Sequence, residues 1–306
     1  MRWMMIALWF VSLAVQAQDL NLQPVAVAPD VYAVVGDLAG QTYENDGLNN
    51  NLGFVVSDAG VLVINTGPSE RVARALHAAI RKITAQPVKW VVNVNSQNHY
   101  WLGNGYFKSL GATILASKEA ERVMREMGAQ QLATNKALLK EKADGTVLTY
   151  PTELIADRRE LKVGKIPVQL LHFGPAHTPG DLVVWLPQQK ILFSGDIVYT
   201  ERLLAVIPIG NTINWVQAFD KLAALNPKTI VPGHGRPTTV ETARRDTRDY
   251  LSFLLAEAKR ILDAGGSLQD AVEKVDQSRF RSLANFDLLA LRNMNQVFQE
   301  VERDAF

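Results

Sequence analysis

Short apolar runs rich in β-branched residues come in clusters along this chain, and helical patterns lie between the clusters. Residues 25–36, 51–57 and 61–67 are runs of this kind, and each is closed by Gly, Asp or Pro, as strands commonly are. Apolar residues then recur at helical spacing over 69–83. Because strands are grouped and do not alternate one by one with helices, the order favours two sheets packed face to face with helices outside.

The rest of the chain repeats this order. The remaining predicted strands cover 88–95, 112–117, 147–155, 159–163, 167–174, 181–187, 190–196 and 229–233. Predicted helices run from Lys118 to about Glu141, with Ser117 as N-cap, and from Thr212 to Leu225. Helical patterns follow from about residue 238 to the C-terminus, interrupted at Gly265. With no Pro/Ser-rich linker and no repeat, we predict one domain over 18–306, with a core of about 20–240 and a helical extension of about 241–306.

The composition excludes several classes of partner. Lys plus Arg number 32 and Asp plus Glu number 31, a net charge of +1, so the chain lacks the basic excess typical of proteins that bind nucleic acid or anionic lipid. It contains no cysteine, which removes thiolate metal ligands and thiol nucleophiles. We therefore expect a small-molecule substrate or ligand, and the sequence does not determine the oligomeric state.

Residues 1–17 have the pattern of a secretory signal peptide. One positive charge at Arg2 precedes an apolar run of roughly a dozen residues, and a small-residue exit at Val15-Gln16-Ala17 indicates cleavage after Ala17. The alternative is an uncleaved membrane anchor, but the run is shorter than the ~20 residues that span a bilayer. The pattern predicts a secreted or periplasmic protein that leaves the membrane after cleavage.

Histidine and aspartate side chains occur where predicted strands end. His99, His177 and His234 follow strands, and Asp196 ends the strand at 190–196. Loops at one edge of a sheet converge, so residues far apart in sequence can meet there. A set of imidazoles and a carboxylate is a normal ligand shell for zinc or a similar divalent ion.

Three motifs carry a family resemblance. The segments "HFGPAHTPGD" (172–181), "FSGD" (193–196) and "VPGHG" (231–235) resemble the later metal-binding motifs of the metallo-β-lactamase fold superfamily, over about residues 20–239. The resemblance implies an αββα sandwich with metals at one edge between the sheets. It also implies that His177 is a ligand of the first metal, Asp196 the bridging carboxylate and His234 a ligand of the second.

The chain departs from the family at the H-x-H-x-D-H motif. Asn95 and Gln97 stand where the two histidines of the first metal are expected, His99 where the aspartate is expected, and Tyr100 where the last histidine is expected. A neutral carboxamide oxygen is a weak zinc ligand. The sequence therefore predicts a degenerate site that holds one divalent ion, zinc, through His99, Asp196 and His234, with His177 as a further ligand.

Two functions fit these residues. One is a single-metal hydrolase, with His99 and Asp196 as catalytic residues and Asn95, Gln97, Tyr100 and Trp101 as substrate contacts. The other is a metal-free, inactive relative, in which a protonated histidine pairs with Asp196 and the sandwich serves as a periplasmic binding or accessory protein. The fold does not identify a substrate, and no G-x-S-x-G motif supports a serine hydrolase.

Overall fold

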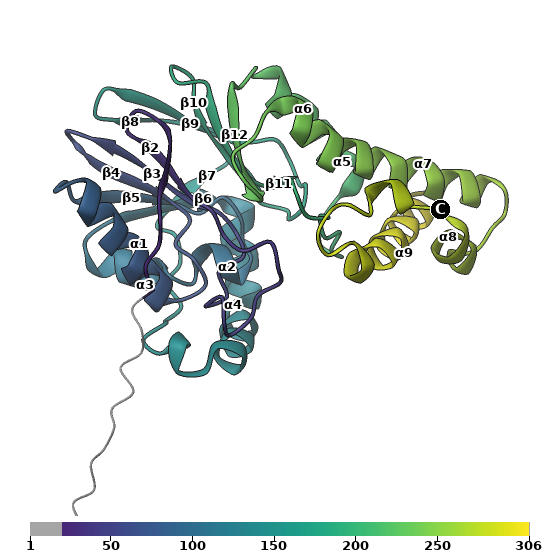
Figure 1. Cartoon of the computed structure of the whole chain (residues 1–306), viewed down its shortest axis with the longest axis horizontal. Helices are drawn as coiled ribbons and strands as arrows, with labels where there is room; N and C mark the ends of the chain where they lie inside the picture. Colours follow the sequence, from purple (N-terminus) through teal and green to yellow (C-terminus); the bar gives the residue numbers. More distant parts are fainter. Residues whose placement is uncertain (1–19, 306) are drawn as a thin grey trace, which may run out of the picture.

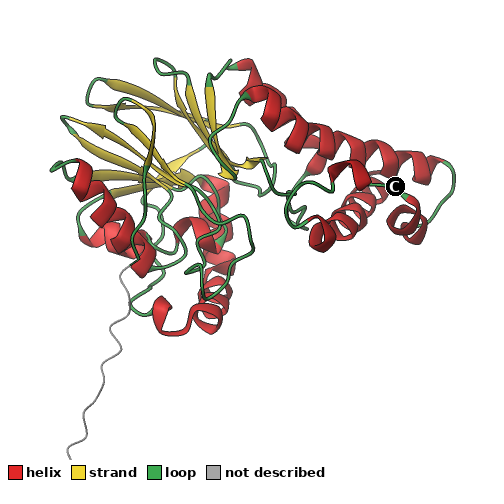
Figure 2. Ribbon diagram, viewed as in Figure 1, coloured by secondary structure: helices red, strands yellow, loops and turns green. Residues whose placement is uncertain are grey.

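The computed structural model describes residues 20–305. Within them the strands form two sheets, which face each other in Figure 1 and are drawn in yellow in Figure 2. The first sheet keeps its strands in sequence order, antiparallel from β1 to β4 and parallel from β4 to β7. Its strands are β1 Val25–Ala28, β2 Val31–Val34, β3 Leu52–Ser57, β4 Gly60–Ile64, β5 Val88–Val92, β6 Thr113–Ser117 and β7 Glu153–Ile155.

The second sheet has the order β12-β11-β10-β9-β8. Its pairs are antiparallel except β11 and β12, which run parallel because α5 connects them. Its strands are β8 Arg158–Val163, β9 Ile166–His172, β10 Leu182–Leu186, β11 Ile191–Tyr199 and β12 Thr229–His234.

Helices cover both outer faces. The α-helices are α1 Glu70–Ile83, α2 Asn98–Trp101, α3 Asn104–Ser109, α4 Lys118–Leu139, α5 Thr212–Ala224, α6 Val240–Ala243, α7 Asp249–Asp263, α8 Leu268–Lys274 and α9 Phe286–Ala305. Short 3-10 turns cover Lys140–Ala143 and Ser278–Phe280, and a π turn covers Arg244–Arg248. The predicted N-cap is confirmed, because Ser117 Oγ accepts a hydrogen bond from Ala120 N at 3.0 Å.

Apolar packing forms three layers. Side chains of both sheets meet between them, including Val55, Leu62, Leu170 and Val184. Leu76 of α1 packs in a separate cluster on the outer face of the first sheet. A third cluster joins the outer face of the second sheet to α5, α7 and α9; its largest fully buried side chains are Trp215, Phe219, Tyr250 and Phe298. These layers confirm the αββα sandwich with added C-terminal helices.

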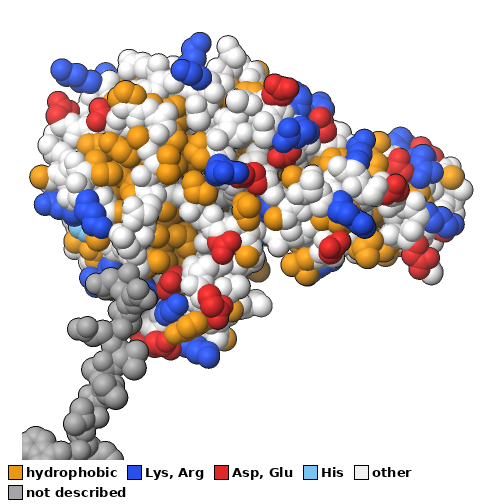
Figure 3. All heavy atoms as spheres, in the orientation of Figure 1, with side chains coloured by type: hydrophobic (Ala, Val, Ile, Leu, Met, Phe, Trp, Pro, Cys, Tyr) orange, Lys and Arg blue, Asp and Glu red, His pale blue; other side chains and the backbone are white. Residues whose placement is uncertain are grey.

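The C-terminal helices project from the second sheet (Figure 1). They share one apolar cluster with β11, so no gap in packing separates them from the sandwich within residues 20–305. On the face shown in Figure 3, basic and acidic side chains are interspersed over these helices. Every helix in the described part of the chain is too short or too polar to span a bilayer. The predicted signal peptide, residues 1–17, lies outside the described residues and stays a prediction, as do the domain boundaries.

The structure differs from the predicted elements in several places. Residues 25–36 form a hairpin, because Asp30 adopts a left-handed turn conformation with φ 62° between β1 and β2. The predicted strand at 147–155 shrinks to Glu153–Ile155. The loop after β5 contains the short helices α2 and α3, whose few residues give no usable periodicity.

Asp196 lies inside a strand, and the prediction that it ends one is wrong. Strand β11 continues to Tyr199. Its pairing with β12 shifts register around Gly195, which has φ 51°. Glycine adopts this left-handed conformation without steric cost, so the strand bulges there and continues beyond the FSGD motif.

Candidate metal site

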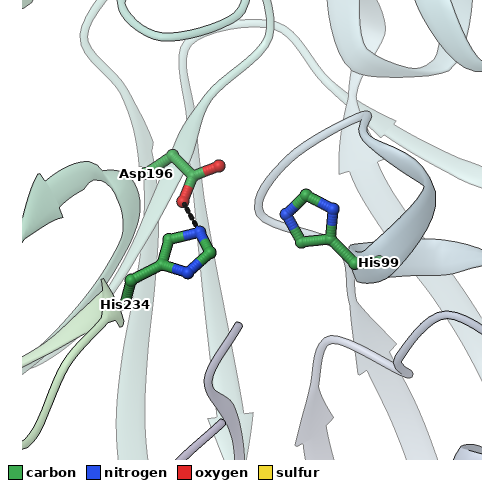
Figure 4. A group of neighbouring side chains, drawn as sticks. All are labelled: His99, Asp196 and His234. Carbon is green, nitrogen blue, oxygen red and sulfur yellow. Dashed lines mark ion pairs between the residues drawn. The ribbon is translucent and has the colours of Figure 1, made fainter. Parts of the chain in front are cut away.

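Three side chains from distant segments meet at one edge of the sandwich. His99 comes from α2, Asp196 from β11 and His234 from the end of β12, and Figure 4 shows His99 facing the other two. One potential ligand atom from each lies within 4.8 Å of the others. All three side chains are buried, and His99 is the most exposed of them at 7%. The structure therefore brings together three of the four predicted metal ligands.

A glycine allows the close approach of β12 to Asp196. A Cβ atom on Gly233 would lie 2.3 Å from Asp196 Oδ1 and 2.7 Å from the Tyr100 hydroxyl oxygen. Any larger residue would push the carboxylate away from the histidine that follows, His234. The small residue before the histidine in "VPGHG" thus has a local steric reason.

The contacts of His234 determine which of its two ring nitrogens carries the hydrogen. His234 Nδ1 lies 2.5 Å from the carbonyl oxygen of Asn49, which can only accept, so Nδ1 carries a hydrogen. Nε2 then points at Asp196 Oδ1, 3.2 Å away (Figure 4). Because both of these atoms bear lone pairs, the contact is favourable when a proton or a metal ion lies between them.

Neighbouring groups keep Asp196 ionised. Burial opposes the charge, but His234 and His177 hold the pKa of this carboxyl below its ordinary value. The Tyr100 hydroxyl donates to Oδ1, and Asn95 Nδ2 lies 3.4 Å from Oδ2. Burial lowers the pKa of the His99 imidazole to about 3, so at neutral pH this ring is uncharged, the form that binds metals.

His177 lies beside this group without joining it. Its Nε2 is 3.5 Å from Asp196 Oδ2 and 2.9 Å from Gln97 Oε1. A hydrogen bond from Nε2 to the amide oxygen of Gln97 places a hydrogen on Nε2, so this nitrogen has no free lone pair for a metal. The role of Gln97 as a substrate contact stays a prediction, and here its amide contacts His177.

Asp181 is a buried carboxyl that the sequence analysis did not single out, although it ends the quoted motif at 172–181. Its oxygens accept hydrogen bonds from Thr178 N, Thr178 Oγ1 and Asn95 Nδ2, at 2.8, 2.6 and 2.8 Å. Asn95 therefore lies between the carboxylates of Asp181 and Asp196, in a position where the family motif has a histidine. Burial raises the pKa of Asp181 to about 7, although the hydrogen bonds from Thr178 oppose this shift.

We expect Asp181 to lower the stability of the metal-free protein as pH rises. Its folded pKa lies above the ordinary 3.8, so between about pH 4 and 7 the folded state binds more protons than the unfolded state. The free energy of unfolding contributed by this group falls by on the order of 1 kcal/mol per pH unit in that window. Buried His99 and His177 have lowered pKa values and act in the opposite direction.

The measurement therefore compares the free energy of unfolding of wild type with that of Asp181→Asn. Denaturant unfolding of wild type and Asp181→Asn is measured from pH 4 to 8 after treatment with a chelator. The stability of the variant relative to wild type should rise with pH up to about 7 and then level off. Parallel curves over the whole range would contradict the raised pKa of Asp181.

Trp101 is placed away from the three ligands. Its ring is 0% exposed and packs against Tyr150, with ring centroids 5.6 Å apart. Its Nε1 donates to Ser96 O at 3.1 Å and to Gln131 Oε1 at 2.9 Å. Tyr100 is also fully buried and contacts Asp196. Substrate contact by these aromatics stays a prediction, and the burial of Trp101 argues for packing.

Sequence reasoning also missed the groups behind His234. Arg202 is 7% exposed, and its guanidinium lies 3.3 Å from His234 Nδ1 and donates to Ala39 O at 3.1 Å. The ring of Tyr199 stacks on His234 with centroids 4.6 Å apart. Neither residue stands in a motif that marks a site, so the sequence carried no signal for them.

Comparison with known protein families identifies the superfamily to which this chain belongs. Residues 45–234, more than half of the chain, match the family model of the metallo-beta-lactamase superfamily. The chain belongs to that superfamily. Among curated members, it is 24% identical over 261 residues to the linear primary-alkylsulfatase of Pseudomonas sp. (strain ATCC 19151), covering 72% of this chain and 49% of that enzyme. It is 26% identical over 208 residues to a metallo-beta-lactamase type 2 of Elizabethkingia meningoseptica, covering 66% of this chain and 75% of the relative.

Solved structures of superfamily members share the fold. A metallo-beta-lactamase from Pontibacter korlensis aligns with a TM-score of 0.63 at 21% identity and covers 76% of this chain and 99% of its own. An inverting sec-alkylsulfatase from Pseudomonas sp. aligns with a TM-score of 0.70 at 17% identity and covers 91% of this chain and 50% of its own. This chain thus spans about half the length of the alkylsulfatases that it matches.

Proposed function

We propose that this chain is a single-metal hydrolase that holds one divalent cation, zinc or a similar ion, through His99, Asp196 and His234. The observation that carries the proposal is the buried group of three donor atoms within 4.8 Å of one another. It is supported by membership of a superfamily of hydrolases. The degenerate first motif is part of the same proposal, because Asn95 and Gln97 provide amides where imidazoles would complete a second metal site.

The donor atoms fit such an ion. His99 Nε2 is buried, and among residues 20–305 it has no hydrogen-bond partner. A buried nitrogen without a partner is costly, and a cation would satisfy its lone pair. Ligands of a tetrahedral zinc lie about 3.4 Å apart when its bonds are about 2.1 Å long, so binding would draw the three donor atoms closer together than the 4.8 Å observed.

The remaining groups of the site support hydrolysis. When bound, a divalent cation supplies Lewis acidity that polarises the oxygen of an electrophilic group and favours ionisation of water. Three protein ligands leave a coordination position open, as in catalytic zinc sites. Tyr100 holds its proton at Asp196 Oδ1, because burial and Asp196 raise the pKa of the phenol well above its ordinary value. Within residues 95–100, Gln97 and Asn98 are half-buried and the others are buried, so these two are the candidates for contact with a substrate.

The substrate that we propose is a small molecule. The relatives named above are an alkylsulfatase and a β-lactamase, so superfamily members of similar sequence act on different small molecules. Since the chain covers only 49% of the alkylsulfatase, we do not extend that enzyme's substrate to it.

A second candidate is a metal-free binding or accessory protein. It is favoured by the contacts of Asp196. Its Oδ1 already accepts a hydrogen bond from the Tyr100 hydroxyl, and its Oδ2 lies 3.4 Å from Asn95 Nδ2. In that case a proton between His234 and Asp196 would replace the cation, and the site would have no Lewis acid.

Metal analysis separates the two candidates. Wild-type protein purified without added metal should contain near one equivalent of a divalent metal per chain, measured by elemental analysis. His99→Ala and His234→Ala should each lose most of it, because two remaining ligands hold zinc weakly. His77→Ala is the matched control: His77 lies on α1, contacts the Tyr106 hydroxyl at 2.8 Å, and should leave the metal content unchanged. A metal content near zero in wild type, even after incubation with zinc, would end the hydrolase proposal.

A further inference from the structure

Two amide side chains, buried Asn135 and half-buried Asn98, connect the main chain at Pro68 to the ring of His99. Asn135 of α4 donates from Nδ2 to the Pro68 carbonyl oxygen at 2.7 Å, and Asn98 donates from Nδ2 to Asn135 Oδ1. Asn98 Oδ1 in turn lies 3.0 Å from His99 Nδ1. We propose that Asn98 and Asn135 are positioning residues that fix the tautomer of His99, so that its Nε2 lone pair faces Asp196 and His234.

The direction of each bond follows from the first. A carbonyl oxygen can only accept, so Asn135 must turn its NH₂ group toward Pro68 and its oxygen toward Asn98. Asn98 must then present its own NH₂ group to that oxygen, which leaves its Oδ1 for His99. Since Oδ1 is an acceptor, the hydrogen of the neutral His99 ring resides on Nδ1.

A second contact sets the same orientation independently. The backbone N–H of His99 donates to Asn98 Oδ1 at 2.8 Å. A backbone N–H can only donate, so the Asn98 amide cannot turn its NH₂ group toward His99 without losing this bond as well. The amide of Asn98 is thus oriented from both of its ends.

The consequence appears at the other ring nitrogen. With the hydrogen on Nδ1, Nε2 carries the lone pair, and this is the buried atom without a partner among residues 20–305. Metal-binding histidines commonly donate the N–H of the ring nitrogen that does not bind the metal to an acceptor, which fixes tautomer and ring orientation. Asn98 fills that role for a histidine that stands where the family motif has an aspartate. The tautomer assignment stands on these contacts alone, whereas its use in metal binding rests on the proposed function.

Another residue of α4 provides a control that separates tautomer control from anchoring of the loop before α2. Gln131 also belongs to α4 and also holds the loop before α2, because its Nε2 donates to Ser96 O at 3.0 Å and its Oε1 accepts from Trp101 Nε1. It lies outside the amide chain that reaches His99. A role in anchoring α4 to the loop would be shared by Asn135 and Gln131, whereas control of the tautomer belongs to Asn135 and Asn98.

The test is ¹⁵N NMR of metal-free protein labelled at histidine, at a pH where the His99 ring is neutral. The His99 signals are assigned by their loss in His99→Gln. Wild type should show a protonated Nδ1 and an unprotonated Nε2. Asn98→Ala and Asn135→Leu should give a mixture of tautomers or the opposite one, whereas Gln131→Leu should match wild type. Asn98→Asp keeps an acceptor beside Nδ1 and should restore the wild-type tautomer.

Zinc affinity, measured by competition with a chromophoric chelator, is the second readout. Asn98→Ala should weaken binding by about 10- to 100-fold, the usual effect of removing a partner of a metal-binding histidine, and Asn98→Asp should recover most of it. A wild-type ring protonated on Nε2, or an unchanged tautomer in Asn98→Ala, would overturn the inference. If the tautomers behave as expected and wild type binds no metal, the positioning role holds and the single-metal hydrolase fails.

Discussion

Replacing Asp196 by Asn is expected to abolish metal binding, with the affinity for zinc falling by more than about 100-fold. Losing a hydrogen-bond partner of a ligand already costs 10- to 100-fold, and here a ligand itself is lost. Asp196 is the only carboxylate in the group of three that the described residues provide, so its replacement leaves two neutral imidazoles. The amide keeps the size of the side chain, and an oxygen can still accept from the Tyr100 hydroxyl. The measurement is elemental analysis together with chelator competition.

Glu300→Gln provides the matched control for a buried carboxylate. Glu300 is 3% exposed on α9 and accepts hydrogen bonds from Thr212 N and Oγ1 at 2.7 and 2.6 Å, in the C-terminal helical layer. Its replacement should lower stability and leave the metal content at the wild-type value. If Asp196→Asn retained wild-type zinc affinity, Asp196 would not be a ligand, and the proposed site would be wrong.

Replacing Trp101 by Ala is expected to lower the free energy of unfolding by about 3–5 kcal/mol. The indole is fully buried in a small cluster with Leu102, Ala116 and Met124, so its removal leaves a cavity beside α4. The bond from Nε1 to Ser96 O is lost as well. This loss is a large fraction of the 5–15 kcal/mol that is typical of folded domains. Denaturant unfolding measures it.

Leu291→Ala is the control for this prediction. Leu291 is 55% exposed on α9, and truncation of an exposed side chain is expected to change stability by about 0.5 kcal/mol or less. A Trp101→Ala protein as stable as wild type, with a raised KM for whatever substrate is found, would show instead that the indole contacts the substrate. Trp101→Phe should fall between wild type and Ala, because it refills part of the cavity.

Much of the fold could be predicted because strand and helix patterns are local. The β-branched runs became strands, and the helix predicted from Thr212 to Leu225 is α5, which buries Trp215, Phe219 and Leu222. Short elements were missed where the pattern was too brief to reveal a period, as in α2 and α3. The end of β11 was missed because the bulge at Gly195 depends on pairing with β12, a distant strand.

The sequence by itself determined the superfamily and the types of side chain available at the site. Which of those side chains share one point was decided only by the tertiary structure, since His99, Asp196 and His234 lie on separate segments that the sandwich brings together. The tertiary structure also leaves His177 outside this group of three, because its Nε2 contacts the amide oxygen of Gln97. The direction of the His99 lone pair depends on Asn135, 37 residues from Asn98 along the chain. Hydrogen-bond direction is a property of paired groups in space, so no motif of adjacent residues records it.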